Sequence, residues 1–165
     1  MDYRIVQAEV ADAAIIANHR TLMFSENKRH SENSLAEMEQ RYKEWLIHKI
    51  AGGDYIGWFA KTANENILGG VGLWLREWPP ELNDYTGKQG YIENVYVVPT
   101  HRRQGIAHQL MLTLLEWARA STKVYYIDLH ATSMAQLLYK TLGFEVNDGS
   151  MSLWIGQNKT KRVED

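Results

Sequence analysis

The stretch from Pro99 to His108 has the residue types and spacing of an anion-binding turn. A strand rich in β-branched residues ends at Pro99, two basic residues follow at Arg102 and Arg103, and Gly105 begins a run of helix-forming residues. Free amides at a helix N-terminus and the helix dipole favour an anion there. A glycine also lets that anion approach the backbone closely. The pattern therefore predicts a cradle for a diphosphate group.

The strength of such a cradle comes from its amides. A hydrogen bond to a charged group contributes about 1.5–3 kcal/mol, so a few amides supply much of a micromolar affinity. The stretch is not a P-loop, because the Gly-Lys-Ser/Thr ending is absent, and it lacks the three glycines of a dinucleotide fingerprint. The alternative interpretation is an ordinary strand–turn–helix connection with solvated arginines.

Regular elements must position this turn, and the hydrophobic periodicity predicts them along most of the chain. Two helices are expected early: one over 13–24 with Asp12 as its N-cap, and one that starts at the capping box Ser34–Glu37 and ends at Gly52. Later helices are expected over 104–118 and 133–142, and strands over 3–8, 55–61, 67–76, 91–98, 124–130 and 144–155. This order predicts an α/β fold with a sheet of mixed direction.

The composition excludes several classes of protein. The 165 residues predict a single domain over 1–155, followed by a polar tail at 156–165. Cysteine is absent, which excludes disulfide scaffolds and thiol nucleophiles, and the six histidines lack metal-ligand spacing, so no metal is expected. The net charge of −2 argues against a nucleic-acid binder. The apolar runs are too short to span a membrane and no signal peptide is visible, so a cytoplasmic protein is expected.

Two blocks of the sequence resemble the GNAT superfamily of N-acetyltransferases. Residues Arg102–Ala107 fit its Q/R-x-x-G-x-G/A signature, and residues Ala135–Phe144 fit its A-x-x-L-Y-x-x-x-G-F block, in the family's order and separation. The resemblance implies a GNAT-like α/β (α+β) fold, with a mixed, mostly antiparallel twisted sheet, splayed central strands and four flanking helices. It also implies acetyl-CoA as the co-substrate and a primary amine as the acceptor.

The resemblance assigns the co-substrate to residues on both sides of Pro99. The strand before it, at Val95, Tyr96 and Val97, would pair its backbone with the pantetheine arm. Thr132 stands where many members have an asparagine that contacts the coenzyme A arm, and its hydroxyl could replace that contact. The pyrophosphate would be held by Arg102 and by the amides of Arg103, Gln104, Gly105, Ile106, Ala107 and His108.

Glu93 is the candidate general base. An amine such as that of lysine is about 3.4 pKa units from neutrality at pH 7, roughly 4.6 kcal/mol, which a base or a desolvated site must offset. Alternation along the strand places Glu93 on one face with Tyr91, Val95 and Val97. A carboxylate among apolar neighbours is suited to act as a base through a water molecule. The alternatives are a solvent-facing glutamate and an ion-pair partner.

Tyr139 lies in the second block, where family members place a tyrosine beside the coenzyme A sulfur. Tyrosine is a weaker acid than such a thiol. We therefore expect Tyr139 to stabilise the developing thiolate by a hydrogen bond rather than by full proton transfer. The alternative is a core tyrosine, because Ala135, Leu138 and Leu142 lie near it at helical spacing. Trp78 begins a Trp-Pro-Pro loop that either lines the acceptor site or forms a rigid surface turn.

Together these residues predict an acetyl-CoA-dependent N-acetyltransferase that transfers the acetyl group directly to a primary amine of a small molecule or a peptide. Direct transfer is expected because no cysteine can form a thioester. The alternative is a non-catalytic module that binds or senses acyl-CoA. Neither a nucleic-acid partner nor a membrane partner is expected. A homodimer, which is common in the family, is compatible with the sequence.

Overall fold

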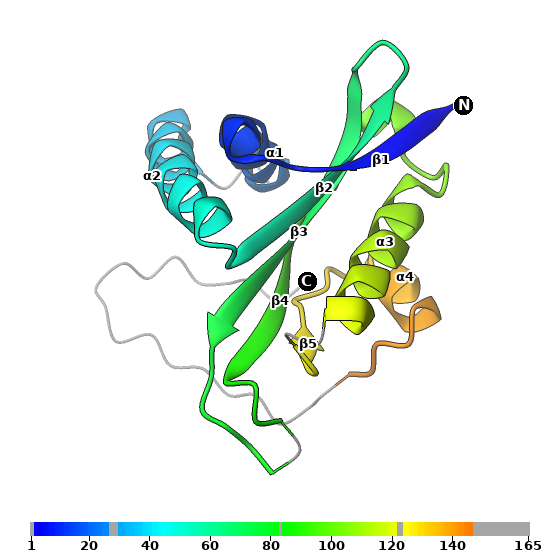
Figure 1. The fold of residues 1–165 in the computed structure, drawn as a ribbon. Coiled ribbons are helices and arrows are strands. Elements are labelled where there is room, and N and C mark those ends of the chain that lie inside the picture. The colour runs from blue at the N-terminus through cyan, green and yellow to red at the C-terminus, as the bar shows by residue number, and fades with distance from the viewer. Residues whose placement is uncertain (1, 27–29, 83, 122–123, 147–165) are drawn as a thin grey trace. The chain divides into compact units, whose positions relative to one another are not determined.

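A five-stranded sheet forms the centre of the fold, with its strands in the order β1-β2-β3-β4-β5 (Figure 1). The first four strands pair antiparallel, and β5 pairs parallel to β4, which confirms a mixed, mostly antiparallel sheet. The computed structural model describes residues 2–26, 30–82, 84–121 and 124–146. The strands are β1 (Tyr3–Gln7), β2 (Tyr55–Thr62), β3 (Ile67–Glu77), β4 (Lys88–Val97) and β5 (Ile127–Asp128).

The described residues form four helices, the number predicted. They are α1 (Ala13–Ser25), α2 (Glu32–Ala51), α3 (Ile106–Ser121) and α4 (Gln136–Thr141), with short 3-10 turns at η1 (Val10–Asp12) and η2 (Pro99–His101). The chain divides into two compact units, residues 1–129 and 130–165. The first unit contains the sheet and the first three helices, and the second contains α4, so each unit is described by itself.

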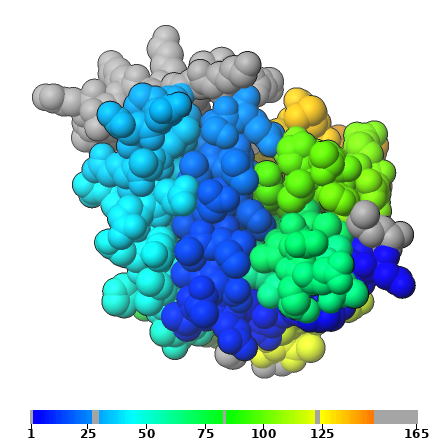
Figure 2. Space-filling model, turned by 90° about the horizontal axis from the view of Figure 1, so that it is seen from above, coloured from blue at the N-terminus to red at the C-terminus, as the bar shows by residue number. Residues whose placement is uncertain are grey.

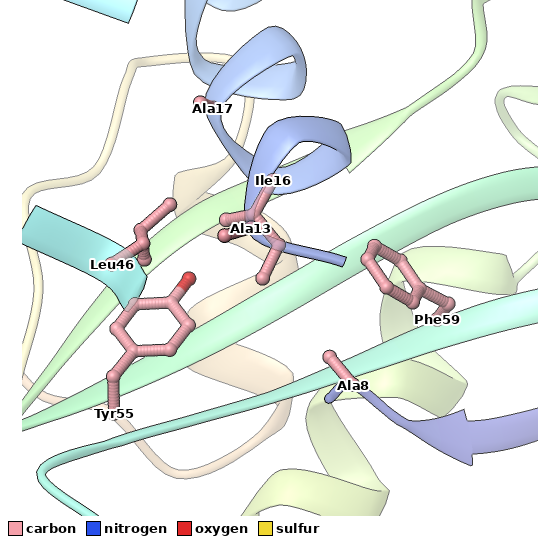
Figure 3. Close-up of a cluster of buried hydrophobic side chains, with 7 residues drawn as sticks. All are labelled: Ala8, Ala13, Ile16, Ala17, Leu46, Tyr55 and Phe59. Atoms are coloured by element: carbon pink, nitrogen blue, oxygen red, sulfur yellow. The ribbon is translucent and has the colours of Figure 1, made fainter. Parts of the chain in front are cut away.

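Helices α1 and α2 lie side by side on one face of the sheet, and α3 lies on the other (Figures 1 and 2). Because both faces of the sheet are covered, the sequences of β2 and β3 are nearly continuous apolar runs rather than alternating apolar and polar residues. On the α3 face, Leu110, Met111 and Leu114 are fully buried. On the other face, α1, α2 and the sheet enclose a cluster of buried side chains (Figure 3): Ala8, Ala13, Ile16, Ala17, Leu46, Tyr55 and Phe59.

Strand β4 contains a β-bulge in its second half. Its pairing with β3 joins Gly72 to Glu93 and Gly70 to Tyr96, so two residues of β4 oppose the single residue Val71. One of these two is Asn94, whose backbone is left-handed with a φ of 55°. Asparagine adopts this conformation more readily than most residues. The bulge interrupts the strict alternation predicted for this strand, so Asn94 and Glu93 are directed to the same face.

Strands β4 and β5 separate soon after they meet. Their pairing covers only Gly90 with Ile127 and Tyr91 with Asp128. From residue 92 to residue 97, β4 pairs with β3 on one side, and in the described part of the chain no strand pairs with its other side. The structure thus confirms the splayed central strands implied by the family resemblance.

Helix α1 starts at Ala13 as predicted but without the predicted side-chain cap, and helix α2 starts earlier than predicted. Asp12 is not the side-chain cap of α1, because its carboxylate accepts the amide of Glu9 at 2.9 Å and closes the 3-10 turn that precedes the helix. The cap of α2 is Ser31, whose Oγ accepts the amide of Ser34 at 3.2 Å, three residues before the predicted cap. Gly52 ends α2 as predicted.

The strand boundaries also differ from the prediction. Strand β4 begins at Lys88 rather than at residue 91, which shortens the preceding loop. The strand predicted over 124–130 is reduced to Ile127–Asp128. The predicted closing strands over 144–155 lie largely outside the described residues, as does the whole tail predicted over 156–165.

Replacing Gly72 with alanine is expected to lower the free energy of unfolding by about 1–3 kcal/mol, because the core is overpacked. A Cβ atom at Gly72 would lie 1.8 Å from the hydroxyl oxygen of Tyr55, so the buried ring must move. Urea denaturation followed by fluorescence measures the change. Gly57→Ala is the matched control in β2, since its Cβ would meet no atom closer than 3.3 Å. Equal stability of the two variants would contradict the prediction.

Candidate active site

Glu93 lies in β4 at the face covered by α1 and α2. Its side chain is 9% exposed. The hydroxyl of Tyr42, from α2, donates to Oε2 of Glu93 at 2.5 Å. Nη1 of Arg20, from α1, lies 3.8 Å from the same oxygen. A solvent-facing glutamate is therefore the wrong alternative, while an ion-pair contact to Arg20 is present.

Asn94 connects the remaining members of this polar cluster. Its Nδ2 donates to the hydroxyl of Tyr42 at 2.7 Å and to the hydroxyl of Tyr55 at 3.2 Å. Its Oδ1 accepts from Nη1 of Arg20 at 3.2 Å. The side chain of Asn94 is buried, and its amide thereby has partners on both its nitrogen and its oxygen. A satisfied buried network of this kind fixes the orientation of its members.

The two tyrosines of the cluster stay protonated. Burial raises the pKa of Tyr42 well above its usual value, and the charge of Glu93 adds to that effect. Burial also raises the pKa of Tyr55. Tyr42 therefore remains a hydrogen-bond donor to Glu93 at physiological pH. Oε1 of Glu93 has no hydrogen-bond partner among the described residues, so one carboxylate oxygen is left for a ligand.

The sequence analysis missed Tyr42, Asn94, Tyr55 and Arg20 as site residues. The hydroxyl contacts of Tyr42 join residues that lie 51 and 52 positions apart in the chain, so no local pattern indicates them. Asn94 carried one usable signal, because asparagine is depleted in strands and this one lies within the predicted strand 91–98, whose other residues, apart from Glu93, are β-branched or aromatic. An asparagine inside such a strand is compatible with a bulge.

His19 of α1 packs against Tyr96 of β4 on the same face. The ring centroids lie 4.7 Å apart, and His19 also contacts Phe59 edge-on. Both His19 and Tyr96 are buried. Burial lowers the pKa of His19 to about 4, so its ring is neutral at physiological pH.

We expect the protein to lose stability in mild acid because of His19. Its pKa is lowered from 6.5 to about 4 on folding, so the unfolded chain binds more protons between these values. The free energy of unfolding should therefore fall by about 3 kcal/mol as the pH decreases through this window. Urea titrations at several pH values measure it. His19→Gln should flatten the decline and His48→Gln, at an exposed site on α2, should not; an unchanged slope in His19→Gln would contradict the assignment.

The turn after β4 leaves a row of backbone amides without protein partners. Among the described residues, no acceptor bonds the amides from Arg103 to His108, and the first paired amide is that of Gln109, which donates to Gly105. Gly105 has a φ of 80°, and a Cβ built there would meet nothing within 4 Å. Arg103 is also left-handed, with a φ of 62°. The geometry fits the predicted cradle, with open space in front of Gly105.

Arg102 lies next to this cradle but has other partners. Its guanidinium forms an ion pair with both carboxylate oxygens of Glu26, which follows α1. Its Nε donates to the carbonyl of Val97 at 2.9 Å. The hydrogen bond and the charge of Glu26 raise the pKa of Arg102. Arg102 thus connects the end of α1 to the end of β4, and one backbone group expected to meet the pantetheine arm, the carbonyl of Val97, already has a partner.

Two further candidates, Tyr139 and Thr132, belong to the second unit. Tyr139 is buried in α4 of the second unit, with its ring edge-on to Phe144. The carbonyl of Thr132 accepts the amides of Ala135 and Gln136 just before α4, and its side chain is exposed.

Trp78 lies in the loop between β3 and β4. Its ring is 41% exposed and its Nε1 donates to Glu81 at 2.9 Å. The amide of Trp78 also donates to the carbonyl of Gly87 at 2.9 Å, which closes the loop at its base. Arg76 stacks over the indole at 5.4 Å. These contacts form a closed surface turn, and the role of Trp78 in lining the acceptor site stays a prediction.

Neither a metal-binding group nor a membrane-spanning helix is found among the described residues. No group of three or more His, Asp or Glu side chains is placed to hold a metal ion within the parts of the chain that the structure describes. Within the same residues, none of the helices combines the length and apolar character needed to cross a membrane.

Comparison with known proteins identifies the class. Residues 18–144 match the Acetyltransferase (GNAT) family. A GCN5-related N-acetyltransferase from Ralstonia eutropha JMP134 is 32% identical, with 94% of this chain and 100% of that chain covered and a TM-score of 0.80. The chain therefore belongs to the GNAT family of acetyltransferases, which confirms the resemblance seen in the sequence.

Two further solved structures share the fold at lower identity. A predicted acetyltransferase from Clostridium acetobutylicum, crystallised with acetyl-CoA, has a TM-score of 0.82 at 23% identity over 92% of this chain and 96% of that chain. Glucosamine-6-phosphate N-acetyltransferase from Arabidopsis thaliana has a TM-score of 0.65 at 16% identity over 94% of this chain and 100% of that chain. A search of curated proteins by sequence finds no significant match.

Proposed function

We propose that this protein is an N-acetyltransferase that moves the acetyl group of acetyl-CoA directly to a primary amine. One observation carries the proposal: β4 holds Glu93 in a polar network and then runs into the unpartnered amides from Arg103 to His108. A single strand therefore joins a base to an anion cradle. The open edge of β4 between them suits the extended pantetheine arm, whose amides can pair with a strand.

The cradle fits the diphosphate of coenzyme A. The amides from Arg103 to His108 lack acceptors among the described residues, and the left-handed Gly105 presents no side chain toward them. Anions bind at such helix N-termini through the amides and the helix dipole. Arg102, paired with Glu26, would support the turn rather than supply a free charge.

The reaction requires two protons to leave the protonated amine. Glu93 would accept the first through a water molecule at the free Oε1, while Tyr42 keeps Oε2 occupied. The neutral nitrogen then bonds to the acetyl carbon and the carbon–sulfur bond breaks. The second proton of the nitrogen is transferred to the sulfur, so coenzyme A leaves as a thiol. Tyr139 would donate a hydrogen bond to the sulfur as negative charge develops there. No covalent acyl-enzyme is needed, and no cysteine is present to form a thioester.

Release of free thiol from acetyl-CoA over a panel of amines tests the proposal, with mass detection of the acetylated product. Amine-dependent thiol release is the expected result. Tyr139→Phe should lower kcat while the KM for acetyl-CoA changes little, because the hydrogen bond strengthens only as the thiolate forms. Binding of coenzyme A without turnover of any amine would favour the non-catalytic alternative. Full activity of Tyr139→Phe would remove the role given to that residue.

A further inference from the structure

Arg20 is a positioned cation with unused hydrogen-bond donors. Its side chain is 27% exposed, and its Nη1 donates to Asn94. Its guanidinium stacks over the rings of Tyr42 at 4.5 Å and Phe24 at 5.3 Å. Among the described residues, Nε and Nη2 have no acceptor. The guanidinium is thus held in one place by its ring contacts while part of its planar edge stays available for a carboxylate.

Arg20 and Glu93 do not satisfy each other. Their closest charged atoms, Nη1 and Oε2, are 3.8 Å apart, which is beyond hydrogen-bond distance. Each of the two groups is instead bonded to a neutral partner, Arg20 to Asn94 and Glu93 to Tyr42. In the described structure, Arg20 also keeps unused donors at Nη2 and Nε, and Glu93 keeps an unused acceptor at Oε1. The site therefore presents one positive and one negative group side by side.

This pair of charges selects among amines. A simple cationic amine gains the attraction of Glu93 but meets the repulsion of Arg20, and a polyamine meets that repulsion with more than one charge. An amine with a carboxylate on the adjacent carbon meets opposite charges at both ends. Its carboxylate matches the unused donors of Arg20, and its amine matches the unused acceptor of Glu93. Its net charge of zero equals the net charge of the Arg20–Glu93 pair.

We propose that the acceptor is a free α-amino acid, with its carboxylate bound by Arg20 and its amine held at Oε1 of Glu93 through the water molecule that takes up its proton. The inference rests on the proposed acetyltransferase function and specifies its substrate class. Arg20 is then the specificity-determining residue of the site. Phe24 and Tyr42 fix its guanidinium, and Asn94 fixes its Nη1, so the carboxylate site exists before the acceptor arrives.

The test compares each proteinogenic amino acid with its α-carboxamide, in the full-length enzyme with acetyl-CoA. The amide keeps the side chain and the amine but removes the negative charge. For at least one pair, kcat/KM for the acid should exceed that for the amide by about 30-fold or more, since losing one partner of a desolvated charge pair costs that much. Arg20→Met should bring this ratio close to unity, mainly through the KM of the acid, and Arg20→Lys should retain part of it.

Arg41→Met is the matched control, because Arg41 is an exposed residue of α2 that pairs only with Glu37 in the described structure. It should leave the acid-to-amide ratio unchanged. Acetylation of amines with no preference for any acid over its amide would overturn the inference while the proposed function stands. Equal losses on acid and amide in Arg20→Met would also overturn it, because they indicate a structural role.

If no amine is acetylated, the proposed function fails, and binding decides the inference separately. Calorimetry with the same pairs, in the presence of coenzyme A, should show the acid binding more tightly than the amide in the native protein and equally in Arg20→Met. Binding of neither ligand, or equal binding of both to the native protein, would overturn the assignment of Arg20.

Discussion

Replacing Glu93 with glutamine is expected to lower kcat by about 10²–10⁴-fold, the usual contribution of a general base. Glutamine has nearly the same shape, and its carbonyl oxygen can still accept the hydroxyl of Tyr42, so the surrounding network is retained. What is lost is the ability to take the proton of the amine. The KM for acetyl-CoA should change little, because Glu93 lies in the strand before the predicted cradle.

Steady-state kinetics with saturating acetyl-CoA measures the effect. Glu44→Gln is a matched control, since Glu44 is an exposed carboxylate of α2 that accepts from Gln40 at 2.7 Å. It should retain the native kcat. A native kcat in Glu93→Gln would show that Glu93 is not the general base and is only a structural partner of Tyr42 and Arg20.

Replacing Gly105 with valine should weaken coenzyme A binding by at least about 2 kcal/mol, or about 30-fold in Kd. The new side chain would occupy the open space in front of the unpartnered amides, where the diphosphate is proposed to lie. The left-handed backbone adds strain, because a β-branched residue does not adopt a φ of 80° readily. If the turn keeps its shape, the valine side chain blocks the diphosphate. If the turn changes shape, its amides no longer point to the diphosphate.

A second glycine separates blockage from strain. Gly53 follows α2 with a φ of 73°, and a Cβ there would also meet nothing within 4 Å. Gly53→Val should therefore carry a similar backbone strain away from the cradle. Calorimetry with coenzyme A should show weakened binding for Gly105→Val alone. The same Kd in both variants would mean that the turn after β4 is not the binding site.

The elements with a clear hydrophobic period could be predicted from the sequence. The buried face of α3 and the paired strands β2 and β3 were predicted within a few residues, because local periodicity reflects which side of an element is covered. The start of α1 was predicted correctly, although the side chain of Asp12 closes a 3-10 turn instead of capping the helix. The start of α2 was wrong because Ser31, which precedes Ser34, is the residue that caps the helix. The length of β5 was overestimated, because β5 pairs with β4 and the two strands separate after two residue pairs.

The candidate site was predictable only in part. Glu93 and the glycine turn belong to one continuous segment, so their order along β4 could be predicted from the chain. The partners of Glu93 and Asn94 come from α1, α2 and β2, and their contacts depend on how these elements pack. The pairing of Arg102 with Glu26 was not predicted for the same reason, because it joins residues 76 positions apart.

The bulge at Asn94 has a second consequence, for solubility. An unpaired strand edge is a template on which another chain can add a strand, and such additions lead to aggregation. The proposed pantetheine site needs that edge of β4 free, so a neighbouring strand cannot protect it. A left-handed residue in the middle of the edge breaks the regular ladder that an incoming strand would require. The bulge that directs Glu93 and Asn94 to the same face therefore also discourages self-association of the free enzyme.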